Sequence, residues 1–568
     1  MIDNYTFKDF KYEYPNFEEV QKRIEEGTNQ LRTASSYEQF KEIIKQMEDY
    51  LNDSSFMMTI AYIRSYQDNS DTFYQEEAPK IMSSFLMLNQ SDWTRAIIES
   101  PYAKDLTKEY GEELLLKLDL ENRVSEHGKE DQAKEQQLIA KYQQLKAGIT
   151  YEFNGQTLSE AQLNKFNEHT DREIRRQAKK VYYKTLLEHK EEFASILDEL
   201  VLVRNQIAKA NGFENYLDYM NAARGRNGYG EKELTMFCEQ VKKDLVPFYH
   251  TLHKAQAKRL GIDKITLYDR SLIFPDGNAK PYQEEEKLME AAKKMYHSLS
   301  KETGEFFDAM LEHELIDIKA SKNKISNMGF CTSLDPLEYP FVFGNCNGTL
   351  FDVIVLTHEM GHAFQFYLTR KNQQFRTYYE QINDIVEIPS KAMEQFTYPY
   401  AELFVGEDAD KFRISHVQEV LEEVGAYCAE HEFETYLYLN PNATTKERAQ
   451  RLLEIEKEYF PDLDVSEFED EIREGAMLFR NMLVYMFPRF GISYSLSDMA
   501  ALEFKVKAEQ DMSKAWEDYI RLLSAGGSKS YKELLALAHL SLPFEEGAVL
   551  RSTSYAKQLM NDYIAKEV

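Results

Sequence analysis

Two histidines and a glutamate form the part of this sequence best suited to chemistry. His358 and His362 stand four residues apart in the string HEMGH, and Glu359 directly follows the first histidine. Residues four apart lie on the same side of a helix, so both imidazoles can bind one ion. The same pattern suits metal-assisted hydrolysis with the glutamate as general base. A structural alternative is that the histidines pair with Glu359 on a helix and bind no metal.

The segment that carries these residues has the composition of a buried helix. Residues 351 to 370 read FDVIVLTHEMGHAFQFYLTR, and the first half is apolar on all sides. Burying two histidines and a carboxylate in such a helix costs free energy unless each polar group has a partner. A metal ion with its bound water satisfies all three groups at once, so this context favours a zinc site over the structural alternative.

A catalytic zinc site needs a third protein ligand and leaves one position open for water. Glu387, in NDIVEIPSKAMEQF, lies 29 residues after His358, which is enough chain to end one helix, turn and return beside it. Pro389 lacks an N–H and is best tolerated in the first turn of a helix, so we expect Glu387 near a helix start. Glu394 follows on the same face. The sequence thus predicts one Zn²⁺ ion bound by His358, His362 and Glu387.

The elements around this site are predicted to be mostly helical. Residues 17 to 210 are charged, low in Gly and Pro, and carry apolar residues at helical intervals. Residues 326 to 349 differ, because Gly, Pro and aromatic residues predict short strands there. Long amphipathic helices are expected at residues 408 to 439, 445 to 459 and 500 to 524.

A short break in the helical pattern suggests a domain boundary. Asn154 and Gly155 interrupt an alternating stretch and predict a hairpin turn, and Ser159 with Gln162 predicts the start of the next helix. We therefore divide the chain into an N-terminal helical lobe, residues 1 to 166, and a catalytic metallopeptidase domain, residues 167 to 568.

Composition limits the partners. Of 568 residues 43% are hydrophobic, enough for a large core, and 97 acidic against 68 basic side chains give a formal net charge of −29. Such a charge disfavours nucleic acid and anionic membranes as partners. The four cysteines form no C-x-x-C pair and are expected to be buried free thiols in a reducing compartment. The N-terminus lacks the pattern of a signal peptide, so the expected location is the cytoplasm. The oligomeric state is open.

Several strings around the site match one family. The sequence resembles the thimet oligopeptidase and oligoendopeptidase F family of metallopeptidases, from roughly Asp171 to the Gly526-Gly527-Ser528 and Pro543-Phe544-Glu545-Glu546-Gly547 stretches. The strings that carry this resemblance are Asn347-Gly348-Thr349, Asp352-Val353, Leu356-Thr357-His358-Glu359-Met360-Gly361-His362-Ala363 and Glu387-Ile388-Pro389-Ser390.

The resemblance implies a fold and a mode of substrate binding. We expect a mostly α, two-lobed protein around a deep channel, with a small β-sheet beside the HExxH helix. Short unstructured peptides would enter such a channel and folded proteins would not. The strand before the active helix, residues 340 to 349, would run beside the substrate and offer backbone hydrogen bonds. The implied activity is endopeptidase cleavage of oligopeptides.

The resemblance also implies roles for single residues. Glu359 would accept the proton of the attacking water, and Tyr494 would donate a hydrogen bond to the oxyanion. Asp352 and Glu394 are candidates for orienting the two histidines. Relatives often carry a histidine where this chain has Leu483, so a donor to the oxyanion or substrate is absent there. The alternatives left open are a changed substrate preference, a lower rate, or compensation by Tyr485.

Two alternative functions remain open at this stage. An exopeptidase would need a cation near the zinc to bind the substrate C-terminus, and the sequence does not place Arg480, Arg489 or any other arginine there. A non-catalytic zinc scaffold is the other alternative. Glu359 argues against it, because a structural zinc site has no use for a base.

Overall fold

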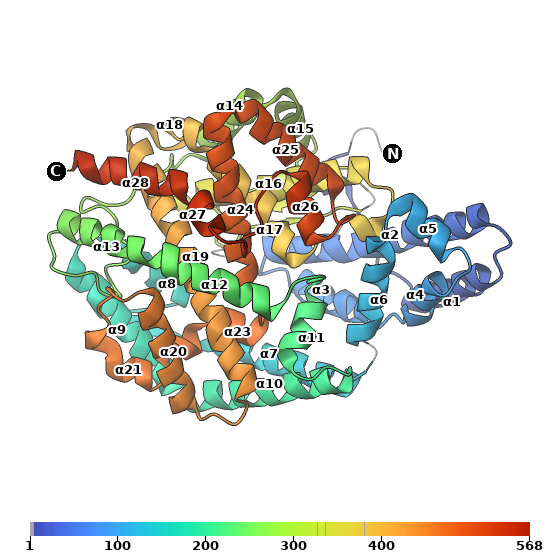
Figure 1. Cartoon of the computed structure of the whole chain (residues 1–568), viewed down its shortest axis with the longest axis horizontal. Coiled ribbons are helices and arrows are strands. Elements are labelled where there is room, and N and C mark those ends of the chain that lie inside the picture. The colour runs from blue at the N-terminus through green and yellow to red at the C-terminus, as the bar shows by residue number, and fades with distance from the viewer. Residues whose placement is uncertain (1–4, 126, 326–327, 336, 380, 568) are drawn as a thin grey trace. The chain divides into compact units, whose positions relative to one another are not determined.

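Helices dominate the structure. The computed structural model describes residues 5–567 except 126, 326–327, 336 and 380 (Figure 1). Within these residues the strands form one two-stranded and one three-stranded sheet, and almost all other regular structure is helical. The predicted mostly α fold is confirmed. In the same described ranges, none of the helices has the length and apolar composition needed to cross a membrane.

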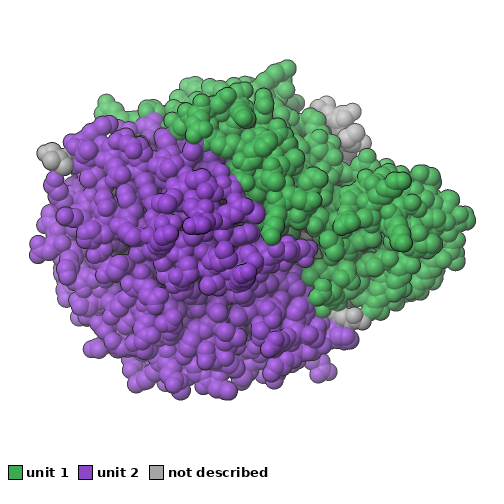
Figure 2. Space-filling view, in the orientation of Figure 1, with its two compact units in different colours: residues 1–123, 280–409, 507–540 green, residues 124–279, 410–506, 541–568 purple. Residues whose placement is uncertain are grey.

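The chain folds into two compact units, each built from three separate stretches (Figure 2). Unit 1 contains Met1–Arg123, Lys280–Ala409 and Lys507–Leu540, and unit 2 contains Val124–Ala279, Asp410–Val506 and Ser541–Val568. Segments distant in sequence therefore share one core. The division of the chain into domains 1 to 166 and 167 to 568 stays a prediction.

Unit 1 contains the three-stranded sheet and the two helices that carry the HExxH and Glu387 segments. One hydrophobic cluster joins its N-terminal helices to Phe375 and Tyr378, which follow the HExxH helix. The elements are α1 (Phe17–Arg32), α2 (Tyr37–Gln67), α3 (Thr72–Leu86), α4 (Ser91–Ile98), α5 (Ala103–Tyr110), α6 (Glu113–Ser125), α14 (Glu285–Leu299), α15 (Lys301–Glu312), β3 (Ile316–Asp317), β4 (Phe330–Thr332), β5 (Phe341–Phe343), α16 (Leu350–Asn372), α17 (Asn383–Phe396), α18 (Glu402–Val405), α25 (Met512–Ala525) and α26 (Tyr531–Leu537).

Unit 2 is helical apart from one hairpin. Its elements are α7 (Lys129–Gly148), β1 (Tyr151–Phe153), β2 (Gln156–Leu158), α8 (Glu160–Asn164), α9 (Arg172–Glu188), α10 (Lys190–Ala210), α11 (Tyr216–Ala223), α12 (Glu231–Asp244), α13 (Val246–Leu260), α19 (Ala409–Leu439), α20 (Thr445–Tyr459), α21 (Glu469–Arg473), α22 (Ala476–Arg480), α23 (Met482–Met486), α24 (Gly491–Gln510), α27 (Ala548–Ser552) and α28 (Ser554–Lys566). Helix α19 starts one residue before the unit, at Ala409, and α24 continues past its end into unit 1.

Local signals in the sequence place several of these elements correctly. Asn154 and Gly155 both adopt positive φ, 50° and 74°, and join β1 to β2 in an antiparallel hairpin. Ser159 and Gln162 form the predicted capping box at the start of α8. The long helix predicted over 500 to 524 is wrong, because α24 ends at Gln510 and Asp511 caps the new helix α25 through the Lys514 N–H.

The sheet order corrects the predicted position of the substrate strand. The order is β3-β5-β4, with β5 parallel to β3 and antiparallel to β4. Since β5 has a partner strand on each side, its backbone groups are already hydrogen-bonded, and it has no free edge for a peptide. The edge strand that packs on α16 is β4. We expected residues 340 to 349 to run beside the substrate. For residues 341 to 343, which form β5, this expectation is wrong.

Candidate metal centre

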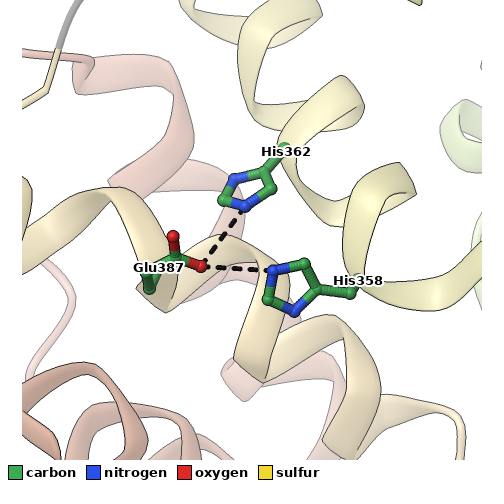
Figure 3. Close-up of side chains that lie close together, drawn as sticks. All are labelled: His358, His362 and Glu387. Carbon is green, nitrogen blue, oxygen red and sulfur yellow. Dashed lines mark ion pairs between the residues drawn. The ribbon is translucent and has the colours of Figure 1, made fainter. Parts of the chain in front are cut away.

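The three predicted zinc ligands come together between α16 and α17, both in unit 1 (Figure 3). The Nε2 atoms of His358 and His362 lie 3.2 Å and 3.3 Å from the same oxygen, Oε2 of Glu387. One ligand atom of each residue lies within 4.8 Å of the others. Two histidines one helical turn apart on α16 thus face a carboxylate from a separate helix.

The separation of these atoms fits a tetrahedral metal site. Zinc binds histidine nitrogen and carboxylate oxygen at about 2.0 to 2.1 Å, and two such bonds at the tetrahedral angle hold their ligand atoms about 3.4 Å apart. The separations of 3.2 Å and 3.3 Å between the histidine nitrogens and Oε2 are close to this value. The donor set of two imidazoles and one carboxylate is also a known catalytic zinc combination. The residues therefore fit the ion that the motif predicts.

Glu394 orients one of the two histidines. Its Oε1 atom lies 2.5 Å from Nδ1 of His358, so the Nε2 atom of that ring points at Glu387. The predicted contact between Glu394 and a histidine is present. Among the described residues the other candidate, Asp352, forms no hydrogen bond or ion pair with a histidine, and it instead accepts hydrogen bonds from the N–H groups of Asn347 and Gly348, both at 2.8 Å. Asp352 therefore fixes the loop before α16, where a carboxylate also suits the positive end of the helix dipole.

The close approach of the two helices depends on Gly361. A Cβ atom built there would lie 2.7 Å from both the Pro389 carbonyl oxygen and the Ser390 Cα. Pro389 lies in the interior of α17, which begins at Asn383, so the expectation that Pro389 stands in a first turn is wrong, and Glu387 lies four residues after the helix start. Packing on α16 outweighs the cost of about 3 kcal/mol for an interior proline. The Pro389 carbonyl accepts a hydrogen bond of 2.8 Å from Tyr519 of α25.

Charges in the site are strongly coupled. Burial lowers the pKa of His358, but hydrogen bonds to Glu387 and Glu394 outweigh it and hold that pKa well above its ordinary value. Burial raises the pKa of Glu387, yet attraction to His362 and hydrogen bonding to both histidines bring it well below the ordinary range. Glu359 differs, because burial raises its pKa and the two histidines offset this only in part. A raised carboxyl pKa suits a group that must take up a proton near neutral pH.

Glu359 lies against the polypeptide that leads into β4. A Cβ built on Gly329 would lie 3.4 Å from Oε1 of Glu359, so the backbone approaches the carboxylate closely. Cys331, the middle residue of β4, also lies near Glu359. Burial is the main cause that raises the pKa of its thiol, and the negative charge of Glu359 raises it further. Cys331 and Cys346 are half-buried, whereas Cys238 and Cys428 are buried as expected.

Sequence reasoning missed the contribution of Ser390. Its hydroxyl lies 3.0 Å from Oε2 of Glu387 and 2.9 Å from the Glu387 carbonyl oxygen, and the side chain is fully buried. The Glu-x-Pro-Ser string contained this residue, and the signal was the spacing of three, which places Ser390 one turn after Glu387. Ser390 restrains the carboxylate that faces both histidines.

The remaining predicted residues belong to unit 2. Tyr494 lies on α24, where its ring stacks on Tyr427 with 5.2 Å between centroids and meets Phe490 edge-on at 5.0 Å. Tyr485 is fully buried, donates to the Phe193 carbonyl oxygen at 3.2 Å and stacks on a second tyrosine. Its hydroxyl is committed to this contact, so the suggested compensation for Leu483 by Tyr485 is wrong.

Comparison with known proteins gives consistent matches. Residues 165–552 match the model described as "Peptidase family M3", and residues 7–124 match "Peptidase M3 N-terminal domain". Oligopeptidase PepF of Bacillus subtilis (strain 168) is 24% identical over 398 residues, which cover 66% of this chain and 56% of that protein. An oligoendopeptidase F homolog of Borreliella burgdorferi is 22% identical over 413 residues, covering 69% of this chain and 67% of the homolog.

A solved structure matches over nearly the full chain. The structure titled "PZ peptidase A with inhibitor 2" superimposes with a TM-score of 0.90 and 35% identity, and the match covers 98% of this chain and 99% of that one. The chain spans little more than half of the Bacillus subtilis relative by sequence, but almost all of this solved structure.

Proposed function

Since the chain belongs to peptidase family M3, we propose that it is a zinc-dependent endopeptidase that hydrolyses short, unstructured oligopeptides. The observation that carries the proposal is the convergence of His358 Nε2 and His362 Nε2 on Oε2 of Glu387, with the Glu359 carboxyl on the same helix. The acidic net charge of −29 fits a peptide substrate better than a nucleic acid, and it fits the proposed cytoplasmic location.

Glu359 is the proposed general base. When bound, zinc supplies Lewis-acid chemistry that polarises a carbonyl and lowers the pKa of water. Glu359 takes a proton from the attacking water and passes it to the nitrogen of the departing amine, so one carboxyl serves as base and then as acid. Glu387 and the two histidines hold the ion, and Glu394 and Ser390 restrain the ligands.

The free edge of β4 is the proposed platform for the peptide backbone. This strand, Phe330–Thr332, is half-buried and follows the segment that approaches Glu359. Backbone pairing along a strand edge binds any extended peptide and is largely indifferent to its side chains. Folded proteins would be excluded, since they present few extended segments. Tyr494 of α24 remains the proposed oxyanion donor, because a neutral phenol can donate to a developing negative charge.

Hydrolysis of an internally quenched peptide with both ends blocked tests the endopeptidase activity. We expect the zinc-loaded wild type to cleave this peptide, and Glu359→Gln to lose at least 99% of the turnover while keeping one zinc per chain. The matched control is Glu305→Gln, which removes an exposed carboxylate of α15 and should keep full activity.

Three results would contradict the proposal. Equal turnover by Glu359→Gln would remove the assigned base. Cleavage of only unblocked peptides would favour an exopeptidase. Bound zinc without cleavage of any peptide by the wild type would favour a scaffold.

A further inference from the structure

Unit 2 contains a cavity of about 550 Å³ with two cations on its wall. Lys179 comes from α9 and Arg480 from the last position of α22, so the folded chain brings together residues about 300 positions apart. Leu483 of α23 lines the same cavity. The cavity volume lies in the usual range for small-ligand sites.

Neither cation has a direct partner among the described residues, although the charge of Glu456 on the same wall attracts Arg480. Within the described residues, Lys179 and Arg480 make no ion pair and no hydrogen bond. The Nζ atom of Lys179 lies 5.8 Å from the ring centroids of Tyr182 and Tyr183. Arg489 of the same unit contrasts with them, because it is fully buried and its guanidinium contacts Glu231, Thr435 and the His431 carbonyl. Arg489 is therefore structural, whereas Arg480 is exposed to solvent and makes no hydrogen bond among the described residues.

Two acidic residues, Glu430 and Glu456, lie on the same wall. Burial and the neighbouring Glu434 raise the pKa of Glu430 to about 8, so this carboxyl is largely protonated at neutral pH. Burial also raises the pKa of Glu456, although Arg480 and Arg270 oppose it. The pKa of Lys179 falls to about 7 through burial and repulsion by the same two arginines. Burial thus disfavours the charge of Lys179, and an anion in the cavity would stabilise it, whereas the pKa of Arg480 is raised, in part by Glu456.

A carboxylate is the anion that the wall fits best. A guanidinium presents parallel N–H donors that match the two oxygens of a carboxylate, and a nearby ammonium adds a further donor. Asn481 lies beside Arg480, and its side-chain amide donates to Glu430 at 2.9 Å. Leu452, Met477 and Leu483 add an apolar patch to a wall that also contains polar side chains such as Asn164 and Ser271, and this patch suits an aliphatic or aromatic side chain. The combination resembles a subsite for the last residue of a peptide.

We propose that Lys179 and Arg480 bind the C-terminal carboxylate of a short peptide in this cavity of unit 2. The presence of two cations is the argument for an anion, and the peptide as its source rests on the proposed oligopeptidase function. The assignment gives Leu483 a role as well: it keeps the wall apolar beside the carboxylate, where a histidine would add a polar group.

Calorimetric titration of Glu359→Gln with matched peptides tests this site without hydrolysis. The peptides are an acetylated pentapeptide without acidic side chains, its C-terminal amide, and an amide whose last residue is glutamate. We expect the free acid to bind at least tenfold more tightly than the simple amide. When Arg480→Gln or Lys179→Met is introduced into the Glu359→Gln protein, the ratio of acid to amide affinity should fall to about twofold or less. Both cavity variants should bind the simple amide as tightly as the Glu359→Gln protein does. This unchanged affinity also shows that the variants are folded. The control, Lys180→Met, removes an exposed lysine adjacent in α9 and should keep the full ratio.

The alternative outcomes are distinct. Equal affinity for acid and amide, or a full ratio in both cavity variants, would overturn the proposal. If the amide that ends in glutamate binds as tightly as the free acid, the site recognises a side-chain carboxylate, and the assignment to the C-terminal carboxylate is overturned. Absence of peptide hydrolysis by the wild type would overturn only the proposed function, because the binding ratio does not depend on cleavage.

Discussion

The Nδ1 atom of His358 lies 2.5 Å from Oε1 of Glu394, while the opposite nitrogen of the same ring faces Glu387 at 3.2 Å. Both carboxylates come from α17, two turns apart. One imidazole is thereby held at both nitrogens by one helix, which fixes the direction of its ring before any ion binds.

Replacement of Glu394 should weaken zinc binding without removing a ligand. Glu394→Gln removes the charge that orients His358, and such outer contacts usually contribute 10- to 100-fold to metal affinity. We expect zinc affinity to fall by about that factor, measured by competition with a chromophoric chelator. Glu305→Gln serves again as the surface control. Unchanged affinity in Glu394→Gln would show that the contact does not orient the ligand.

Replacement of Glu387 should have a larger effect. Glu387→Ala removes the only carboxylate in the predicted ligand set, leaving two histidines. After dialysis against a weak chelator, the variant should retain less than a tenth of the wild-type zinc by elemental analysis. Ser390→Ala loses only a hydrogen bond to that carboxylate and should retain most of its zinc. A full zinc content in Glu387→Ala would exclude it as a ligand.

Gly361 should tolerate no side chain. In Gly361→Ala the new methyl group meets backbone atoms of α17, so the two helices must separate, at a cost of about 1 to 3 kcal/mol. We expect a lower Tm and weaker zinc binding together. Gly148→Ala is the matched control, because nothing lies within 4 Å of a Cβ built at Gly148. Equal Tm values for both variants would contradict the close helix contact.

A buried carboxylate in unit 2 gives a pH-dependent stability. Burial raises the pKa of Glu422, but Arg270 at 2.8 Å and His253 at 3.3 Å outweigh this and lower it to about 2. Because the folded pKa lies below the unfolded one, the stabilisation is complete above pH 4.5 and is lost as the pH falls toward 2. The full effect is on the order of 3 kcal/mol.

Thermal unfolding between pH 7 and pH 3 can measure this contribution. Wild-type Tm should fall more steeply with acid than that of Glu422→Gln, which has no carboxyl to protonate at this position. Parallel curves for the two proteins would mean that the pKa of Glu422 is not depressed.

Two tyrosines of unit 2 should respond differently to loss of the hydroxyl. Tyr494→Phe removes the proposed oxyanion donor and should lower kcat about a hundredfold with little change in KM. Tyr485→Phe removes a buried hydrogen bond to Phe193 and should lower Tm while kcat stays near the wild-type value. The reverse pattern would assign the catalytic phenol to Tyr485.

The sequence by itself determined the features that depend on local spacing. The i, i+4 histidines and Glu359 had to share one helix, and the apolar residues around them required that helix to be buried. The Asn-Gly turn and the Ser159 cap followed from φ preference and side-chain hydrogen bonding within a few residues. Each of these depends on interactions within about two helical turns.

Tertiary structure decided the features that depend on contacts between distant segments. Packing of α16 on α17 placed Pro389 in a helix interior and gave Glu394, and not Asp352, the contact with His358. Strand order left β4 at the edge, although β5 precedes the active helix. Lys179 and Arg480 share a cavity only because separate stretches fold into one unit. Spacing along the chain does not by itself decide such contacts, because they are selected by the free energy of the whole packed unit.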